Sequence, residues 1–364
     1  MKKIFALALA AVMIFAFAAC GGGGSEDEPD YSFADGDQYD EIGGELNVLN
    51  WGEYIDPELI ELFESETGVK VNYIEMTSNE EMLMKLRSAD SSYDICVPSD
   101  YIIEQMIRED MLQPLDMSKI PNAKNIDPKM IEITNGFDPG NKYSLPYMWG
   151  TVGILYNTTM VDEPVDSWGI LWNEKYAGNI WMYDSVRDTI GITLKYLGYD
   201  LNTRNEEEVA AARDKLIEQA PLIKGFGTDE MRQSMIEGNE ALAVIYSGDA
   251  FLCIDENPDL AYVVPKEGSN VWFDNMVIMK NAKNVEAAHA LINFLNDGNI
   301  AARNTEYIYY STPNKAAMDR LDPYFTENET YNPPQDVLNR CELFHYLGDF
   351  VEIYNAAWSK ITSK

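Results

Sequence analysis

The feature that most constrains the fold is a regular alternation of short strands and amphipathic helices that begins near residue 45. Short apolar segments predict strands at 45–49, 69–74 and 93–97. The segments between them carry apolar residues at helical spacing, and Asp56 and Ser78 are placed to cap the helices that follow them. Strand–helix–strand order of this kind predicts a mainly parallel sheet covered by helices.

A second series of alternating elements begins near residue 151. It comprises predicted strands at 152–156, 179–183, 241–246 and 272–279, predicted helices at 189–197, 206–219, 231–237 and 284–295, and a largely helical segment at 335–361. No linker rich in Pro, Gly or Ser separates the two series, so we expect two α/β lobes joined by crossing strands. Each lobe is expected to hold a central, mainly parallel sheet flanked by helices, with a ligand cleft between the lobes where strand ends meet.

The expected lobes are discontinuous in the sequence. Lobe 1 would comprise residues 44–150 and 274–318, and lobe 2 would comprise residues 151–273 and 319–364. A chain of 364 residues is long enough for two domains of ordinary size.

The N-terminus has the organisation of a secretory signal peptide. Two lysines precede the apolar run 4–19, which ends in small residues directly before Cys20. A cysteine at this place resembles the bacterial lipobox, so we expect removal of residues 1–19 and lipidation of Cys20. Residues 20–43 would then form a flexible acidic tether. The alternatives are a plain signal peptide or an apolar anchor helix, for which the run is short.

Net charge and hydropathy restrict where the protein acts and what it binds. The 27 basic and 61 acidic residues give a formal charge of −34. Because nucleic acids are bound by neutralising phosphates, so acidic a chain is a poor nucleic-acid binder, whereas its field attracts small cations. The alternative is that acidity only maintains solubility.

No stretch after the tether is apolar enough to cross a bilayer. We therefore expect an extracytoplasmic protein, anchored by lipid at the outer face of the cytoplasmic membrane, or periplasmic where an outer membrane exists.

Catalytic signatures are mostly absent. Only His289 and His345 are available as histidines, and there is no nucleophile elbow, phosphate-binding loop or HExxH motif. Cys96, Cys253 and Cys341 have neither metal-site spacing nor a CxxC pattern, so we interpret them as buried small hydrophobic residues. We expect no enzymatic activity, no cofactor and no metal. Paired carboxylates are plentiful, so a secreted glycosidase stays open as an alternative.

Five segments at predicted strand ends each carry an aromatic residue, a carboxylate or both. They are 51–54, 99–101, 184–188, 246–249 and 272–274. Ligands of open α/β sheets bind outside the carboxyl ends of strands, so we expect these segments to converge on one cleft. An aromatic face attracts an alkyl ammonium by about 0.5–2 kcal/mol, and a carboxylate adds Coulomb attraction that desolvation opposes. The set predicts a site for a slender polycation, whereas ordinary packing is the alternative for any one segment.

Four segments together resemble a known family. The sequences at 50–54, 93–99, 143–150 and 272–274 resemble, in order and spacing, the spermidine/putrescine-binding proteins of bacterial ABC transporters. The resemblance runs from about Gly44 to the C-terminus. It implies a two-lobed periplasmic-binding-protein fold that closes on a polyamine, delivers it to permease subunits and has no catalytic activity.

The resemblance also implies which residues hold the ligand. The implied ligand-binding residues are Trp51, Tyr54, Ser99, Tyr101, Asp184, Ser185, Asp188, Thr228, Tyr246, Asp249, Trp272 and Asp274. In our hypothesis the aromatic rings at 51, 54, 246 and 272 enclose the alkyl chain. Asp249 and Asp274 hold one ammonium group, and Asp184 or Asp188 holds the other. Ser99, Tyr101 and Thr228 supply hydrogen bonds. Arg187 is expected to order the acidic residues, because it repels a cationic ligand.

Departures from the family pattern leave the preferred polyamine open. Tyr246 stands where the best-known members have tryptophan, and Asp249 lies at a position that is acidic in putrescine-preferring relatives. A C-terminal glutamine that contacts spermidine in some members has no clear counterpart near residues 343–345. Asp188 is shorter than the glutamate often found at its position.

Other functions are compatible with parts of the sequence. A receptor for a sugar or for iron is the nearest rival, although a sugar site needs many neutral hydrogen-bonding groups and an iron site favours histidine. A secreted glycosidase and a cell-surface adhesin are rivals from other classes. The partners expected here are a polyamine, the permease subunits of an ABC transporter and, through the lipid, the membrane, with the protein itself a monomer.

Overall fold

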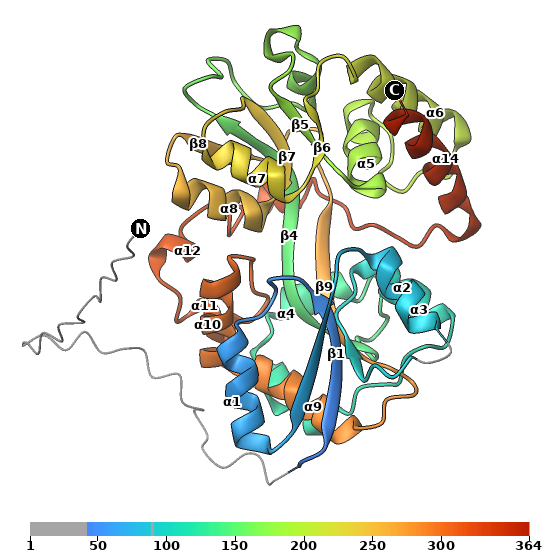
Figure 1. Ribbon diagram of the computed structural model, residues 1–364, viewed down its shortest axis with the longest axis vertical. Coiled ribbons are helices and arrows are strands. Elements are labelled where there is room, and N and C mark those ends of the chain that lie inside the picture. Colours follow the sequence, from blue (N-terminus) through green and yellow to red (C-terminus); the bar gives the residue numbers. More distant parts are fainter. Residues whose placement is uncertain (1–41, 89–90, 364) are drawn as a thin grey trace, which may run out of the picture. The chain divides into compact units, whose positions relative to one another are not determined.

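Two long strands, β4 (Ser144–Asn157) and β9 (Val271–Ile278), carry the chain between two groups of helices (Figure 1). Nearly all residues of β4 and all of β9 are buried, as expected for strands that are covered on both faces. The computed structural model describes residues 42–88 and 91–363, which belong to one compact unit. The predicted signal peptide, Cys20 and almost all of the predicted tether lie outside the described residues.

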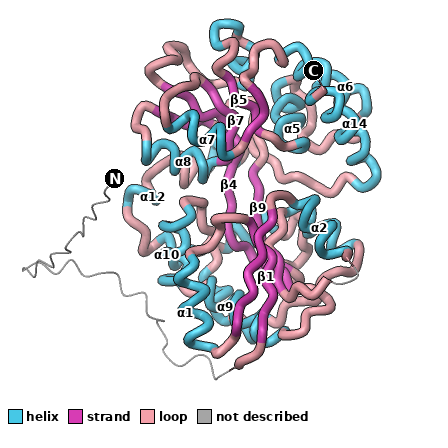
Figure 2. The backbone as a smooth tube through the Cα atoms, viewed as in Figure 1, coloured by secondary structure: helices cyan, strands magenta, loops and turns pink. Residues whose placement is uncertain are grey.

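The other strands are shorter, and helices lie around them (Figure 2). The strands are β1 (Glu45–Trp51), β2 (Lys70–Met76), β3 (Ile95–Cys96), β5 (Ile180–Tyr183), β6 (Gly225–Gly227), β7 (Leu242–Tyr246) and β8 (Leu260–Val263). The helices are α1 (Pro57–Thr67), α2 (Asn79–Arg87), α3 (Asp100–Arg108), α4 (Pro128–Thr134), α5 (Val186–Tyr196), α6 (Glu206–Gln219), α7 (Asp229–Ile236), α8 (Ser247–Glu256), α9 (Val285–Leu295), α10 (Gly298–Ile308), α11 (Lys315–Met318), α12 (Pro323–Thr326), α13 (Gln335–Leu338) and α14 (Val351–Thr362).

The described strands form one mixed sheet in the order β2–β1–β3–β9–β4–β7–β5–β6, and β8 pairs with β4 outside this path. Strand β1 is parallel to β2 and β3, and β5 is parallel to β6 and β7. Every described pairing of β4 and β9 is antiparallel. The predicted α/β lobes joined by crossing strands are therefore confirmed. Parallel pairing is limited to the outer strands of each lobe, where helical crossovers connect the strands.

Separate apolar cores lie on the two sides of the crossing strands. In one core Phe63 of α1 packs against Phe294 of α9, with ring centroids 5.4 Å apart. The other core surrounds the fully buried Trp168 and includes residues of α5, α6 and α14. Successive residues of β9 pack in different apolar clusters. Trp272 belongs to the core around Trp168, whereas Phe273 belongs to a third cluster that includes residues of β1 and α3. Of the three proposed lobe boundaries, 150/151 falls inside β4, 273/274 falls inside β9, and 318/319 falls at the end of α11.

The helix caps inferred from the sequence are confirmed, but other local predictions were wrong. Asp56 accepts a hydrogen bond from the Glu58 amide, and Ser78 accepts one from the Glu81 amide. The segment 335–361 is helical only in α13, a 3₁₀ turn at Gly348–Phe350 and α14. Between them the Glu342 amide donates to the Ser269 carbonyl at 2.9 Å, so pairing with the segment before β9 replaces the helix. Strand β4 begins well before the predicted residue 152, and helices α8 and α10 were not predicted.

The two described residues of the predicted tether, Ile42 and Gly43, contact the rest of the fold. The amides of Ile42 and Gly43 both donate to the Thr67 carbonyl, at 2.9 and 3.0 Å. Ile42 also packs against the core around Phe63. Within residues 42–88 and 91–363, no helix combines the length and apolar character needed to cross a bilayer.

The contact between β4 and β8 yields a test of the fold. A Cβ atom at Gly153 would clash with the ring of Tyr262 and with the Val263 carbonyl. We expect Gly153→Ala to lower the free energy of unfolding by about 1–3 kcal/mol, because overpacking must displace β8. Calorimetric melting measures this change. Gly52→Ala is the matched control, since its Cβ would meet only the Glu75 side chain, at 3.8 Å. Equal melting temperatures for the two variants would contradict the predicted clash.

Candidate ligand-binding site

The candidate site is built on a row of six aromatic rings that extends from β4 to the end of β5. Neighbouring ring centroids lie 4.6–5.6 Å apart with interplanar angles of 57–77°. Such tilted and edge-to-face contacts are the favoured geometry for aromatic pairs. In spatial order the row consists of Tyr147, Tyr54, Tyr310, Trp272, Tyr246 and Tyr183.

Strand β4 places the middle of this row. Trp272 on β9 lies opposite Gly150, and Tyr246 at the end of β7 lies opposite Val152. A Cβ atom at Gly150 would lie 2.6 Å from Cζ2 of Trp272, so glycine at this position lets the indole lie against the strand. Because β7 and β9 flank β4 on opposite edges, the strand brings residues from distant parts of the sequence into one row.

Each of three tyrosines in the row donates its hydroxyl hydrogen to an aspartate. Tyr54 donates to Oδ2 of Asp274 at 2.9 Å, and Tyr246 donates to Oδ2 of Asp188 at 2.8 Å. Tyr310 donates to Oδ2 of Asp249 at 2.9 Å. Burial raises the pKa of all three phenols well above the usual value, so the hydroxyls stay protonated and remain donors. The row therefore carries carboxylates fixed beside aromatic rings.

Asp274 is held entirely by neutral donors among the described residues. Besides the bond from Tyr54, its Oδ1 accepts a hydrogen bond from the Ser99 hydroxyl at 2.7 Å. The residue is 5% exposed, and burial raises the pKa of the carboxyl to about 7 although both hydrogen bonds oppose the shift. A cation placed here would favour the charged carboxylate.

Asp188 lies at the other side of Trp272 in a similar environment. Its Oδ2 accepts hydrogen bonds from Tyr246 and, at 2.7 Å, from the Ser185 hydroxyl. Its Oδ1 is buried and has no hydrogen-bond partner in the described structure, and the same is true of Nε1 of Trp272. Burial raises the pKa of Asp188. A buried carboxylate oxygen without a donor is rare in proteins, and at Asp188 it leaves an acceptor open to a ligand donor.

Asp249 differs from the other two aspartates because it has a cationic partner. Arg232 Nη1 lies 3.3 Å from its Oδ1, while Tyr310 bonds its Oδ2. Arg232 Nη2 also lies 3.5 Å from Oε2 of Glu53, in the loop after β1. Burial raises the pKa of Asp249 and the Arg232 charge opposes this shift. Our sequence hypothesis placed Asp249 beside Asp274 on one ammonium group, and it did not include Arg232.

Four other predicted residues lie outside the row of rings. The indole Nε1 of Trp51 donates to the Val97 carbonyl at 2.9 Å, and its ring is half-buried between two apolar clusters. The Tyr101 hydroxyl contacts Asn79 at 3.2 Å, and its ring lies near Phe344. Asp184 and Thr228 are exposed, and among the described residues no side-chain hydrogen bond joins either of them to the three aspartates.

Arg187 forms no hydrogen bond with an acidic side chain among the described residues, although its charge opposes the rise in the pKa of Asp188. Its guanidinium lies 4.4 Å from the ring centroid of Phe344 and 5.3 Å from that of Tyr101. It donates to Oδ1 of Asn202 at 3.1 Å and to the His345 carbonyl at 3.3 Å. Arg187 therefore attaches the segment that contains Phe344 and His345 to α5.

Sequence analysis missed three tyrosines of the row. Tyr147 lies in a segment that we used only for the family resemblance, and Tyr183 was taken as the end of a strand. Tyr310 follows α10, which was not predicted, so nothing placed its ring near the other segments. The aromatic pair Tyr309–Tyr310 directly before Ser311 was the available signal, but it lacks the acidic residue that is present in each of the five predicted segments.

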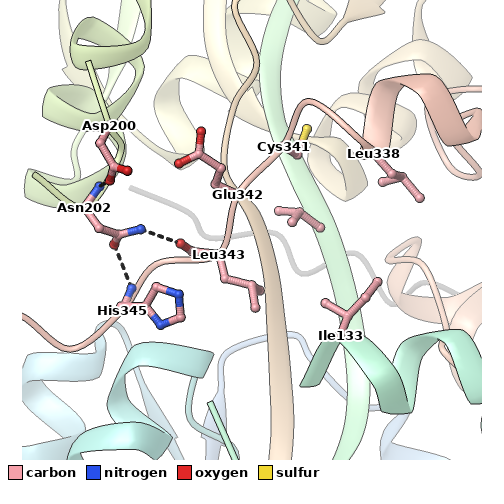
Figure 3. A pocket seen from close by; sticks show the side chains of 9 residues that line it. Ile133, Asp200, Asn202, Leu338, Cys341, Glu342, Leu343 and His345 are labelled. Atoms are coloured by element: carbon pink, nitrogen blue, oxygen red, sulfur yellow. Dashed lines mark hydrogen bonds between the residues drawn. The ribbon is translucent and has the colours of Figure 1, made fainter. Parts of the chain in front are cut away.

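A cavity of about 490 Å³ lies elsewhere, beside the segment 338–345 (Figure 3). Its lining residues are Ile133, Asp200, Asn202, Val271, Leu338, Cys341, Glu342, Leu343 and His345. None of the predicted ligand-binding residues lines it. Asn202 uses its amide to bond the Leu343 carbonyl at 2.8 Å and the His345 amide at 2.7 Å. We place the candidate site at the row of rings because Asp274 and Asp188 are found there, two buried carboxylates that accept hydrogen bonds from tyrosines of the row and form no ion pair among the described residues.

Comparisons with known proteins agree with this placement of the chain among solute receptors. Residues 58–333 match the family described as bacterial extracellular solute-binding protein. The chain is 38% identical over 318 residues to the spermidine/putrescine-binding periplasmic protein of Escherichia coli strain K12, covering 87% of this chain and 91% of that protein.

Two solved structures are similar over the same region. One is the spermidine/putrescine ABC transporter substrate-binding protein PotD of Streptococcus pneumoniae, with 41% identity, a TM-score of 0.76 and coverage of 88% of this chain and 100% of that one. The other is the TpPotD lipoprotein of Treponema pallidum, with 30% identity, a TM-score of 0.80 and the same coverage. The chain belongs to the bacterial extracellular solute-binding proteins, in the group that contains the spermidine/putrescine-binding periplasmic proteins.

Proposed function

We propose that this protein captures a polyamine, putrescine or spermidine, and delivers it to the permease of an ABC transporter without altering it chemically. The observation that carries the proposal is the pair of buried carboxylates at Asp188 and Asp274, each bonded by hydroxyl groups and lying on either side of Trp272. Relatives that carry the names of spermidine/putrescine-binding proteins support the same ligand class.

The chemistry of the row suits an alkyl chain with a charge at each end. Aromatic faces contact methylene groups and attract an ammonium by about 0.5–2 kcal/mol. A carboxylate in partly desolvated surroundings adds a Coulomb term that is large enough to offset desolvation when the ammonium donates all of its hydrogen bonds. The Oδ1 atom of Asp188, which has no hydrogen-bond partner among the described residues, would accept one of the hydrogen bonds of the ammonium group.

We assign Asp274 to one ammonium group and Asp188 to the other. Asp188 is favoured over Asp184 because it is buried and bonded to Tyr246, whereas Asp184 is exposed. The rings of Tyr54, Tyr310, Trp272 and Tyr246 would enclose the chain, with Trp51 and Tyr101 beside them. Ser99 and Ser185 orient the two carboxylates, and Thr228 would contribute at most at the edge of the site.

We further propose that the mature protein is a monomeric lipoprotein held outside the cytoplasm through Cys20. The arrangement of the N-terminal sequence supports the anchor, and one structural relative is itself a lipoprotein. Lobe 1, residues 44–150 and 274–318, would move against lobe 2, residues 151–273 and 319–364. Bending within β4 and β9 would close the lobes on the ligand and present a closed surface to the permease.

A thermal-shift panel tests the proposed ligand class. We expect putrescine, cadaverine, spermidine or spermine to raise the melting temperature, because a ligand at a hundredfold its dissociation constant stabilises the folded state by about 2.7 kcal/mol. The control is 1,4-butanediol, which has the length of putrescine but no ammonium groups. No shift with any polyamine, or an equal shift with the diol, would exclude the proposal. Glycoside turnover by the purified protein would instead favour the glycosidase.

Substitution of the proposed ammonium ligands forms a second prediction. We expect Asp274→Asn and Trp272→Ala each to weaken polyamine binding, the first by about 30-fold or more, because loss of one partner of a buried charge pair costs roughly 2–5 kcal/mol. Isothermal titration calorimetry measures the affinities. Asp166→Asn is the matched control, since that carboxylate is exposed and pairs with Lys266. Unchanged affinity in both site variants would reject this placement of the ligand.

Binding of putrescine should depend on pH because of Asp274. Burial raises the pKa of its carboxyl to about 7, so close to half of the molecules hold a proton there at pH 7. A bound ammonium favours the charged form, so binding must release that proton. Affinity should therefore rise between pH 6 and pH 8 and fall progressively below pH 7.

Calorimetry in buffers of different ionisation enthalpy counts the protons released on binding. We expect release near pH 7 in the wild-type protein and a clear reduction in Asp274→Asn, which lacks the titrating group. Proton uptake on binding, or release that is identical in the variant, would show that Asp274 does not meet the ammonium.

A further inference from the structure

Arg232 lies inside the candidate site although a cation is unfavourable in a receptor for cations. Helix α7 holds it there, with Met231 and Met235 buried beneath. Its guanidinium lies 3.3 Å from Asp249 on the first turn of α8. The side chains of Arg232 and Asp249 are only 25% and 20% exposed. Because arginine does not lose its proton in proteins, this is a permanent charge.

The pairing uses both oxygens of Asp249. Oδ1 faces the guanidinium, and Oδ2 accepts the Tyr310 hydroxyl at 2.9 Å. By contrast, the hydrogen bonds that described side chains make to Asp274 and Asp188 all come from hydroxyl groups of serine or tyrosine. The site thus holds three acidic groups along one row of rings, of which one is already neutralised from within the chain.

From this difference we infer that Arg232 is an internal counter-ion that sets how many ammonium groups the site accepts. The inference rests on the proposed function and deepens it. Two buried carboxylates that form no ion pair within the described residues, Asp274 and Asp188, match the two charges of an alkyl diamine. A third ammonium group would have to approach Asp249, where the guanidinium repels it and already occupies the acceptor. The site therefore selects diamines over triamines, and Arg232 is a specificity-determining residue.

Further acidic groups hold the guanidinium in this position. Nη2 lies 3.5 Å from Glu53 and 3.7 Å from Asp229, which is one turn earlier on α7. Both of these carboxylates are largely exposed, so solvent screens their attraction for a ligand ammonium. They favour a guanidinium that stays over Asp249, and they do not add a buried position for a third ligand charge.

A purely structural ion pair would give a different experimental result. If Arg232 only fastened α7 to α8, its loss would weaken the binding of every polyamine by a similar factor. An internal counter-ion makes the ratio of affinities change, because its loss leaves Asp249 free for a third ammonium group. The measured quantity is therefore the ratio of the spermidine and putrescine dissociation constants, obtained by calorimetry on the mature chain.

We expect the wild-type protein to bind putrescine more tightly than spermidine. Arg232→Gln should shift the ratio toward spermidine by at least tenfold. Asp249→Asn should shift it the other way, because the guanidinium then loses its least exposed carboxylate partner and repels the longer, more highly charged ligand. Arg213→Gln is the matched control, since Arg213 is 23% exposed and pairs with the neighbouring Asp214 at 2.7 Å, on α6.

The outcomes separate this inference from the proposed function. A wild-type protein that binds no polyamine would overturn both. A wild-type protein that binds putrescine, with the same affinity ratio in Arg232→Gln or a shift in one direction for both site variants, would overturn the inference alone. Thermal melting establishes that each variant is folded, and Arg232→Met replaces Arg232→Gln if the latter is not.

Discussion

The hydroxyl-to-carboxylate hydrogen bond is the interaction on which this site depends. Burying a carboxylate is costly unless its oxygens accept hydrogen bonds, and a protein usually supplies a cation as well. At Asp274 and Asp188 the partners are instead tyrosine and serine hydroxyls. Neutral donors hold each carboxylate in a fixed direction without cancelling its charge. The remaining charge is then available to a ligand, and the raised pKa of Asp274 reflects how poorly it is stabilised without one.

The crossing strands make this arrangement possible. A row of rings drawn from β4, β5, β7, β9 and two loops needs a common frame, and β4 provides it by pairing with β7 on one edge and β9 on the other. Gly150 keeps the indole of Trp272 close to that frame. The same strands connect the two cores, so a bend in them changes the distance between Asp274 and Asp188 while each keeps its local hydrogen bonds. Rigid local geometry and variable separation are what a closing receptor requires.

Much of the site could be predicted from the sequence because its residues lie at the ends of recognisable strands. Tyr246 and Trp272 adjoin predicted strands, and both proved to be in the row with Tyr54. Tyr310 and Arg232 could not be placed, since both meet Asp249 on α8, a helix that was not predicted. The helix expected over 335–361 failed for a related reason, because residues 339–347 form tertiary hydrogen bonds that local propensity does not encode. Local pattern predicts elements, whereas contacts between elements decide which side chains meet.

The net charge of the whole chain and the individual carboxylates of the site have different consequences. The net charge of −34 is a property of the whole chain, and its long-range field raises the rate at which cations of any kind arrive, to an extent that salt reduces. It cannot distinguish one amine from another. Discrimination requires charges that water does not screen, and these are the few buried carboxylates along the rings. Because each of them acts over a short distance in a desolvated setting, neutralising a single one from within the chain changes which ligand fits, even though the net charge changes by only one unit.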